Sequence, residues 1–188
     1  MLIPELGYWL PVKDGEARAY AIMQRHYTFQ AYADGRRQDA TNRNRHLFVG
    51  PGEKLVLLGA DENALFVWRK FIDKSGQTGV NCAVFRNESD RRASDLIREA
   101  EVIAWARWPG ERLYTYVDAR KVRGDVPGYC FRRAGWKHCG ESAARKLLIF
   151  EKFPPERRLT CVRADGCADD RLPNSDVGCG AAAAQLGR

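Results

Sequence analysis

The side chains best suited to chemistry in this sequence are the adjacent His26 and Tyr27, Asp118 and Tyr129. An imidazole titrates near neutral pH and is the commonest metal ligand in proteins, so His26 can act as a base or bind a metal. Asp118 ends an apolar segment, where a carboxylate can orient an amine, accept a proton or bind the same metal. Each also has an interpretation without chemistry: the His-Tyr pair packs on a sheet, and Asp118 caps a turn.

Basic residues occur in pairs along the chain, and the formal net charge is +7. Arginine forks bind phosphate oxygens with two hydrogen bonds, so a polyanionic partner is one interpretation and a solvated basic surface is the other. Five residues in polar segments are the predicted contacts to nucleic-acid phosphates: Arg43, Arg45, Arg120, Lys121 and Arg123.

Apolar periodicity predicts strands and helices that must position these groups. The predicted strands cover 54–59, 64–71, 80–85, 113–118 and 146–151, and the predicted helices cover 94–108 and 127–135. This order predicts an α/β fold with a mixed, partly parallel central sheet and at least one parallel crossover. Ser94 is the predicted N-cap of the long helix, Pro127 the first residue of the short helix, and Gly135 the left-handed residue that ends it.

The loop before the long helix predicts a place for a phosphate-bearing donor. Arg86 and Ser94 flank this loop, and the first turn of a helix binds anions through its free N–H groups. Capping by Ser94 and phosphate binding are compatible, since both use the start of the helix. Arg86 and Ser94 are therefore the predicted cofactor-binding residues.

Composition bounds the remaining possibilities for the 188 residues. We expect one folded domain at 1–158, followed by a disordered Gly- and Ala-rich tail at 159–188. No segment has the length of apolar sequence that spans a membrane, and the first residues lack the features of a signal peptide, so the expected location is the cytoplasm. The six cysteines form no Cys-x-x-Cys pair, which disfavours a structural zinc site.

The order of elements resembles that of the GNAT acyltransferase superfamily. The segment from Cys130 to Trp136 is similar to the short helix and the aromatic-x-x-x-Gly-aromatic step of GNAT proteins. In many of them the first aromatic residue is a tyrosine that acts as the general acid. Here that residue is Phe131, which has no proton to give, and Tyr129 lies two residues earlier. The loop 86–94 also lacks the glycines with which GNAT enzymes bind the pyrophosphate of acetyl-CoA.

Within this superfamily the chain resembles the Mom family of phage DNA-modification proteins over residues 20–152. The order of several short segments supports the resemblance: 26–27, 85–88, 94–100, 116–118, 120–123, 128–131 and 134–136. The family adds a carbamoylmethyl group to the exocyclic amine of adenine in phage DNA, which blocks host restriction enzymes. The resemblance therefore implies a transferase that binds double-stranded DNA in the cytoplasm of a bacterial host. An iron requirement and acyl-CoA binding have been proposed for the family, and the resemblance leaves the donor open.

The resemblance places a flipped adenine near Asp118 and Tyr129, with His26 and Tyr27 close by and His26 and Asp118 as the metal ligands. Tyr114 and Tyr116 share one face of a strand, where they can stack on a base or pack in the core. Two other functions stay open. One is an acyl-CoA-dependent N-acyltransferase acting on a protein, a small amine or tRNA, and the other is a nucleic-acid-binding module without catalysis.

Overall fold

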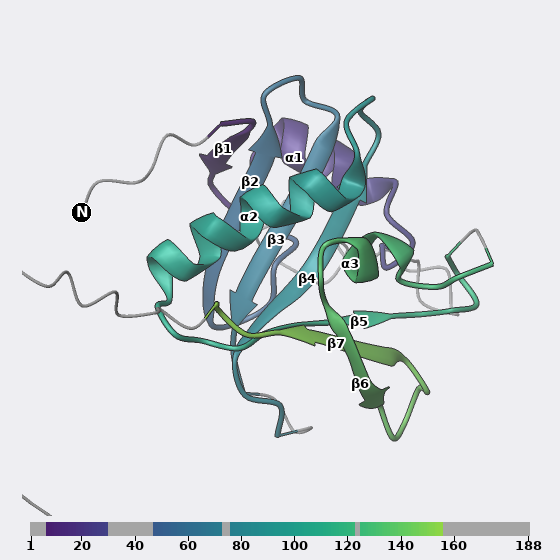
Figure 1. The fold of residues 1–188 in the computed structure, drawn as a ribbon. Coiled ribbons are helices and arrows are strands. Elements are labelled where there is room, and N and C mark those ends of the chain that lie inside the picture. Colours follow the sequence, from purple (N-terminus) through teal and green to yellow (C-terminus); the bar gives the residue numbers. More distant parts are fainter. Residues whose placement is uncertain (1–6, 30–46, 73–75, 123–124, 156–188) are drawn as a thin grey trace, which may run out of the picture. The chain divides into compact units, whose positions relative to one another are not determined.

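The computed structural model describes residues 7–29, 47–72, 76–122 and 125–155 (Figure 1). The chain divides into two units between Pro155 and Glu156, and every described residue belongs to the first unit. The expected disordered tail at 159–188 lies outside the described residues. The same holds for three predicted phosphate contacts: Arg43, Arg45 and Arg123.

A seven-stranded mixed sheet forms the centre of this unit, with the strand order β1-β2-β3-β4-β5-β7-β6. The strands are β1 (Trp9–Val12), β2 (Glu53–Gly59), β3 (Ala64–Lys70), β4 (Val80–Asn87), β5 (Leu113–Val117), β6 (Lys137–Glu141) and β7 (Leu148–Lys152). Among these strands β4 and β5 run parallel, and every other neighbouring pair is antiparallel. The predicted mixed α/β sheet with a parallel crossover is therefore confirmed.

Helices cover both faces of the sheet (Figure 1). Helix α2 (Ala93–Arg107) connects β4 to β5 and packs on one face, and α1 (Ala17–Gln24) packs on the other. The short helix α3 (Tyr129–Arg133) lies on the same side as α2, and its Phe131 is buried in the core beneath α2. Two separate apolar clusters result, one on each face of the sheet.

Sequence patterns did not predict the two edge strands, β1 and β6. Strand β1 contains Pro11, which removes a backbone donor and is tolerated at an edge. Strand β6 is polar and largely exposed, so it carries no apolar pattern to detect. Both strands form because a neighbouring strand offers free backbone groups, which is a tertiary effect.

Two predicted helix ends were wrong and one is confirmed. The N-cap of α2 is Arg92, and Ser94 is already the second helical residue. Helix α3 begins after Gly128, which adopts the left-handed conformation at φ 74°, so Pro127 precedes the helix. Gly135 follows the C-cap of α3 at φ 91°, as its predicted left-handed role requires.

Strands β4 and β5 separate soon after they meet (Figure 1). They pair only from Val80 opposite Leu113 to Cys82 opposite Thr115. On the other side of β4, the register with β3 shifts so that Ala83 is an extra residue, the mark of a β-bulge. The bulge reverses which face the following side chains occupy, and the separation opens a gap in the middle of the sheet.

Candidate functional site

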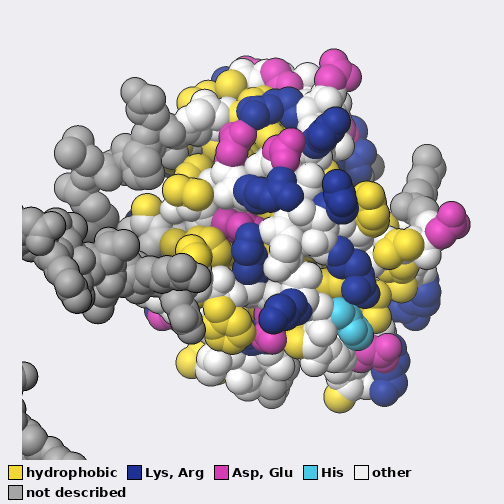
Figure 2. Space-filling view, viewed as in Figure 1, with side chains coloured by type: hydrophobic (Ala, Val, Ile, Leu, Met, Phe, Trp, Pro, Cys, Tyr) yellow, Lys and Arg dark blue, Asp and Glu magenta, His cyan; other side chains and the backbone are white. Residues whose placement is uncertain are grey.

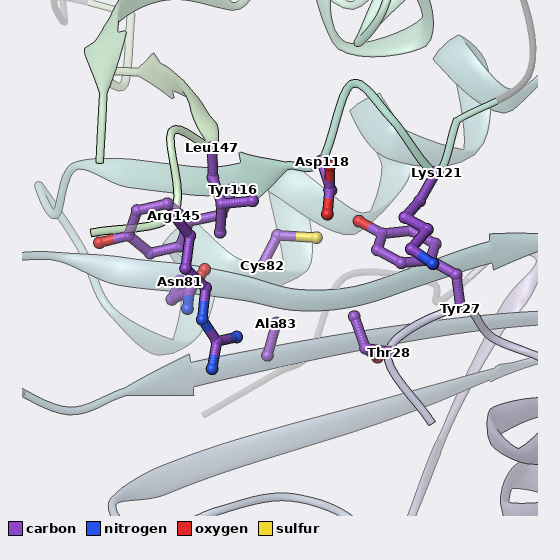
Figure 3. Close-up of a pocket in the computed structure, with 10 residues that line it drawn as sticks. All are labelled: Tyr27, Thr28, Asn81, Cys82, Ala83, Tyr116, Asp118, Lys121, Arg145 and Leu147. Atoms are coloured by element: carbon purple, nitrogen blue, oxygen red, sulfur yellow. The ribbon is translucent and has the colours of Figure 1, made fainter. Parts of the chain in front are cut away.

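Two cavities meet at the gap between β4 and β5. Both are lined by Tyr27, Cys82 and Tyr116. The α1-side cavity, of about 310 Å³, has polar lining residues that include Asn81, Asp118, Lys121 and Arg145 (Figure 3). The α2-side cavity, of about 510 Å³, is lined by residues that include His26, Phe85, Arg86, Val117, Tyr129 and Phe131.

Side-chain alternation along the strands explains why the cavities lie on opposite faces. Val117 of β5 belongs to the core cluster that α2 covers, so its neighbour Tyr116 points to the opposite, α1-covered face. Cys82 of β4 belongs to the same cluster, and Asn81 therefore also points toward the α1-covered face. The residues that line both cavities therefore stand between the two faces of the sheet.

Tyr27 is the side chain that connects the two cavities. Its ring lies against the His26 ring, with 4.4 Å between the ring centres, and Figure 3 shows its hydroxyl pointing toward Asp118. The hydroxyl hydrogen-bonds the backbone of Asp118, and burial is the main cause that raises the pKa of this phenol. Tyr27 therefore keeps its proton at neutral pH and can donate it to a hydrogen bond.

His26 is buried and fixed through both ring nitrogens. Its Nδ1 lies 2.7 Å from the Thr28 hydroxyl and accepts a hydrogen bond from the Thr28 N–H at 3.3 Å. The ring also hydrogen-bonds the backbone of Phe85. Burial, assisted by the nearby positive charge of Arg86, lowers the pKa of His26 to about 4. The imidazole is neutral at pH 7, and its position sets the position of the Tyr27 ring.

Asp118 follows β5 and presents a carboxylate to the α1-side cavity. Two nitrogens of Arg120 hold the carboxylate, at 2.9 and 3.0 Å, and the hydrogen bond to Arg120 is the main cause that lowers the pKa of Asp118. The Arg120 side chain is 73% exposed, which leaves part of it available to solvent or to a phosphate. Asp118 therefore stays ionised and can accept a hydrogen bond or a proton.

The predicted metal pair does not meet in one cavity. His26 lines the α2-side cavity and Asp118 lines the α1-side cavity, with Tyr27 between them. Across residues 7–29, 47–72, 76–122 and 125–155, no group of three or more His, Cys, Asp or Glu side chains is placed to hold a metal. With the His26 nitrogens and the Asp118 carboxylate already engaged, this arrangement does not fit an iron ion, and iron stays a prediction that no step below uses.

A third cavity, of about 490 Å³, lies at the start of α2. We call it the helix-start cavity because of this position. It shares Tyr129 and Cys130 with the α2-side cavity. Its charged lining residues are Arg92, Asp95, Arg98 and Arg133. The N-cap residue of α2, Arg92, makes no side-chain capping hydrogen bond to the first turn of the helix. Together with the arginines, the N–H groups of this turn favour an anion.

The two predicted cofactor-binding residues lie in neighbouring cavities. Ser94 lines the helix-start cavity, and Arg86 lines the α2-side cavity. Arg86 Nε is 2.5 Å from Glu88, whose other partner is Arg25 at 2.6 Å. Tyr129, which lines both cavities, is 60% exposed and stands at the first position of α3.

Among the lining residues of the α1-side cavity that sequence patterns did not predict, Asn81 and Arg145 bear most on its chemistry. Asn81 had a detectable signal, because it is the polar exception in an apolar strand. Arg145 lies in the turn between β6 and β7, and only the folding of that hairpin brings it near β4. Lys121, a predicted phosphate contact, lines the same cavity.

None of the helices in the described part of the chain is long and apolar enough to cross a membrane. Comparison with known protein families, with curated proteins and with solved structures gives no match to this chain.

Proposed function

We propose that this chain is a GNAT-like transferase of the Mom type, which modifies the exocyclic amine of adenine in DNA. One observation carries the proposal: two cavities on opposite faces of the sheet share Tyr27, Cys82 and Tyr116 as lining residues beside the gap between β4 and β5. A transferase needs an acceptor and a donor to meet at one point, and this gap provides such a point. The sequence resemblance supplies the identity of the acceptor.

The α1-side cavity is the proposed acceptor site. Tyr27 and Tyr116 offer aromatic surfaces on which a flipped base can stack. Lys121 and Arg145 place positive charge at the same cavity, where the DNA backbone must approach. Asp118 supplies an ionised carboxylate beside the amine.

The α2-side and helix-start cavities form the proposed donor site. The uncapped first turn of α2 and the arginines around it suit the phosphates of a donor. Figure 2 shows further Lys and Arg side chains spread over the face that carries α2 and α3. Tyr129 lines both of these cavities, and this shared position supports its proposed role as the acid for the leaving group.

The chemistry requires help because the lone pair of adenine's exocyclic amine is delocalised into the ring. In the proposed step the amine nitrogen forms a bond to the transferred carbon, and the bond from that carbon to the donor's leaving group breaks. Asp118 accepts the proton that the nitrogen loses, and Tyr129 donates a proton to the leaving group. The hydrogen bond from Tyr27 to the Asp118 backbone would keep the Asp118 carboxylate in position beside the amine.

A second candidate function is an acyl-CoA-dependent N-acyltransferase with a protein, small-amine or tRNA acceptor. The anion-binding features of the helix-start cavity favour it, since coenzyme A carries a pyrophosphate. The absence of glycine from the loop at residues 86–94 opposes it, because close backbone approach to phosphate is harder there.

Co-expression with a plasmid tests the proposal. Mass analysis of digested plasmid nucleosides should reveal a modified deoxyadenosine with the wild-type chain. Asp118→Asn should lower its yield about 100-fold or more, as loss of a catalytic base does. Asp125→Asn is the matched control: Asp125 is exposed, lines none of the three cavities and should leave the yield unchanged. Unmodified deoxyadenosine in cells that express the folded protein and are supplied with iron would refute the proposal.

A further inference from the structure

A buried amide oxygen without a hydrogen-bond partner belongs to a residue that lines the α1-side cavity. The Asn81 side chain lines this cavity, Asn81 is 9% exposed, and its Oδ1 has no hydrogen-bond partner. Burying an acceptor without its hydrogen bond costs free energy, so native proteins rarely leave one unpaired. Among the described residues only Arg69 Nε shares this condition, and Arg69 lines none of the three cavities. The Asn81 acceptor is therefore expected to find its partner in a bound molecule.

The fold holds this amide in a defined position. Asn81 pairs with Tyr114 in the short parallel ladder, one residue before β4 and β5 separate. A hydrogen bond of 2.9 Å from the Thr115 hydroxyl to the Cys82 carbonyl fixes the ladder beside it. Because the backbone is fixed, the amide can select among ligands instead of adapting to each one.

The groups around the amide define the chemistry of the ligand. Oδ1 accepts hydrogen bonds, so the ligand must present an N–H or O–H donor. Figure 3 shows Asn81 beside Tyr116 and Arg145 on one side of Cys82, with Tyr27, Asp118 and Lys121 on the other. An aromatic surface, two basic groups and two acceptors suit a nucleotide whose base carries an amino group.

We propose that the α1-side cavity is the pocket for the flipped base and that Asn81 is the residue that selects adenine. This inference rests on the proposed function. Asn81 Oδ1 accepts one hydrogen of the exocyclic amine, and its amide NH₂ donates to the neighbouring ring nitrogen, the pairing by which asparagine reads adenine. Asp118 accepts the other hydrogen of the amine. A base without the amino group leaves both acceptors unpaired and binds more weakly.

The test measures binding without any donor or turnover. Fluorescence anisotropy is recorded with a duplex that presents one unpaired adenine opposite an abasic site, and with the same duplex carrying purine, which lacks the amino group. The wild-type protein should bind the adenine duplex about tenfold more tightly. Asn81→Leu should lose this preference, whereas Asn63→Leu, at an exposed turn outside the cavities, should keep it.

The stability of the variant separates selection from a structural role. Because Oδ1 is unpaired in the free protein, replacing the amide by leucine should not lower the midpoint of thermal unfolding. If Asn81→Leu does not fold, Asn81→Ala also removes the acceptor, and together with the wild-type comparison of the two duplexes it still decides between the outcomes. Equal wild-type affinity for adenine and purine overturns the inference, and so does an undiminished preference in a folded Asn81 variant.

Two outcomes distinguish this inference from the function on which it rests. Modified deoxyadenosine in the plasmid assay with an adenine preference independent of Asn81 overturns only the pocket assignment. No modified nucleoside and no binding to either duplex overturn both.

Coenzyme A also contains adenine, so free coenzyme A is titrated in parallel. If Asn81→Leu weakens coenzyme A and leaves both duplexes unaffected, the pocket binds the donor's adenine and the inference fails.

Discussion

Tyr27 links a histidine and an aspartate that do not share a cavity. The His26 ring lies against one side of the phenol, and the hydroxyl hydrogen-bonds the Asp118 backbone. A buried neutral imidazole with both nitrogens engaged is suited to positioning. At this scale the structure shows an ionised carboxylate, a phenol that hydrogen-bonds the carboxylate's backbone and a buried imidazole packed against the phenol.

The shifted pKa of His26 gives a pH dependence of stability. The unfolded chain protonates this residue near pH 6.5, whereas the folded protein does so near pH 4. Between these values the unfolded state binds the additional proton, so the free energy of unfolding falls as the pH falls from about 6.5 to about 4. The full loss amounts to about 3 kcal/mol. His26→Gln should remove this part of the decline, as measured by urea unfolding at a series of pH values.

His138→Gln is the control for this experiment, since His138 lies exposed in β6. It should retain the decline of the wild-type protein over the same pH range. An unchanged decline in His26→Gln, or an equal reduction in both variants, would show that burial of His26 is not the cause.

How much of the site the sequence predicts depends on how far apart its members lie in the chain. His26, Tyr27, Asp118 and Tyr129 were predicted, and each lines at least one of the two neighbouring cavities, the α1-side and the α2-side cavity. No sequence pattern indicates that the Tyr27 ring separates His26 from Asp118, because this depends on how the residues after α1 pack against β4 and β5. Their catalytic roles stay predictions.

At the scale of elements, the bulge in β4 and the short pairing with β5 create the site. The three central strands, the long helix and the crossover followed from periodicity, since each has a regular apolar pattern. The extra residue Ala83 left no sequence signal, because a bulge shows only as a change of register against a neighbouring strand. The missed Ser94 position has a similar origin, as Ala93 is already helical without a side-chain cap.

Helix α3 depends on Gly128 for its position beside the α2-side and helix-start cavities. Gly128 has φ 74°, and a Cβ there would lie 2.5 Å from Phe150, a fully buried residue of β7. Gly128→Ala should therefore cost the left-handed strain and a core clash together, about 2–4 kcal/mol in the free energy of unfolding. Urea unfolding measures the loss.

Gly110→Ala separates the two contributions, because Gly110 has φ 79° and its Cβ would meet nothing within 4 Å. It should lose only the strain of about 1–2 kcal/mol. Equal losses in the two variants would mean that packing against Phe150 does not set the position of α3. A larger loss at Gly110 would contradict the argument outright.

At the scale of the whole molecule, the sheet separates the two proposed substrates. The proposed DNA site opens on the α1-covered face, and the proposed donor site opens on the face that carries α2 and α3. In the proposed reaction the two reactants meet at the gap beside Tyr27. Such an arrangement lets a bulky duplex and a phosphate-bearing donor bind together without competing for one surface.

The positive charge of the molecule makes the proposed DNA binding dependent on salt. Each phosphate that a Lys or Arg neutralises releases counterions, so the logarithm of the binding constant falls linearly with the logarithm of salt concentration. Lys121 and Arg145 lie at the α1-side cavity, so Lys121→Ala and Arg145→Ala should each reduce this slope by about one. Arg18→Ala is the control, since Arg18 pairs with Glu16 and Glu62 and lines none of the three cavities; its slope should match the wild type. Anisotropy titrations with one duplex across a range of salt concentrations provide the slopes. A slope that falls equally in all three variants would mean that the DNA phosphates contact basic residues over the whole surface and not specifically at the α1-side cavity.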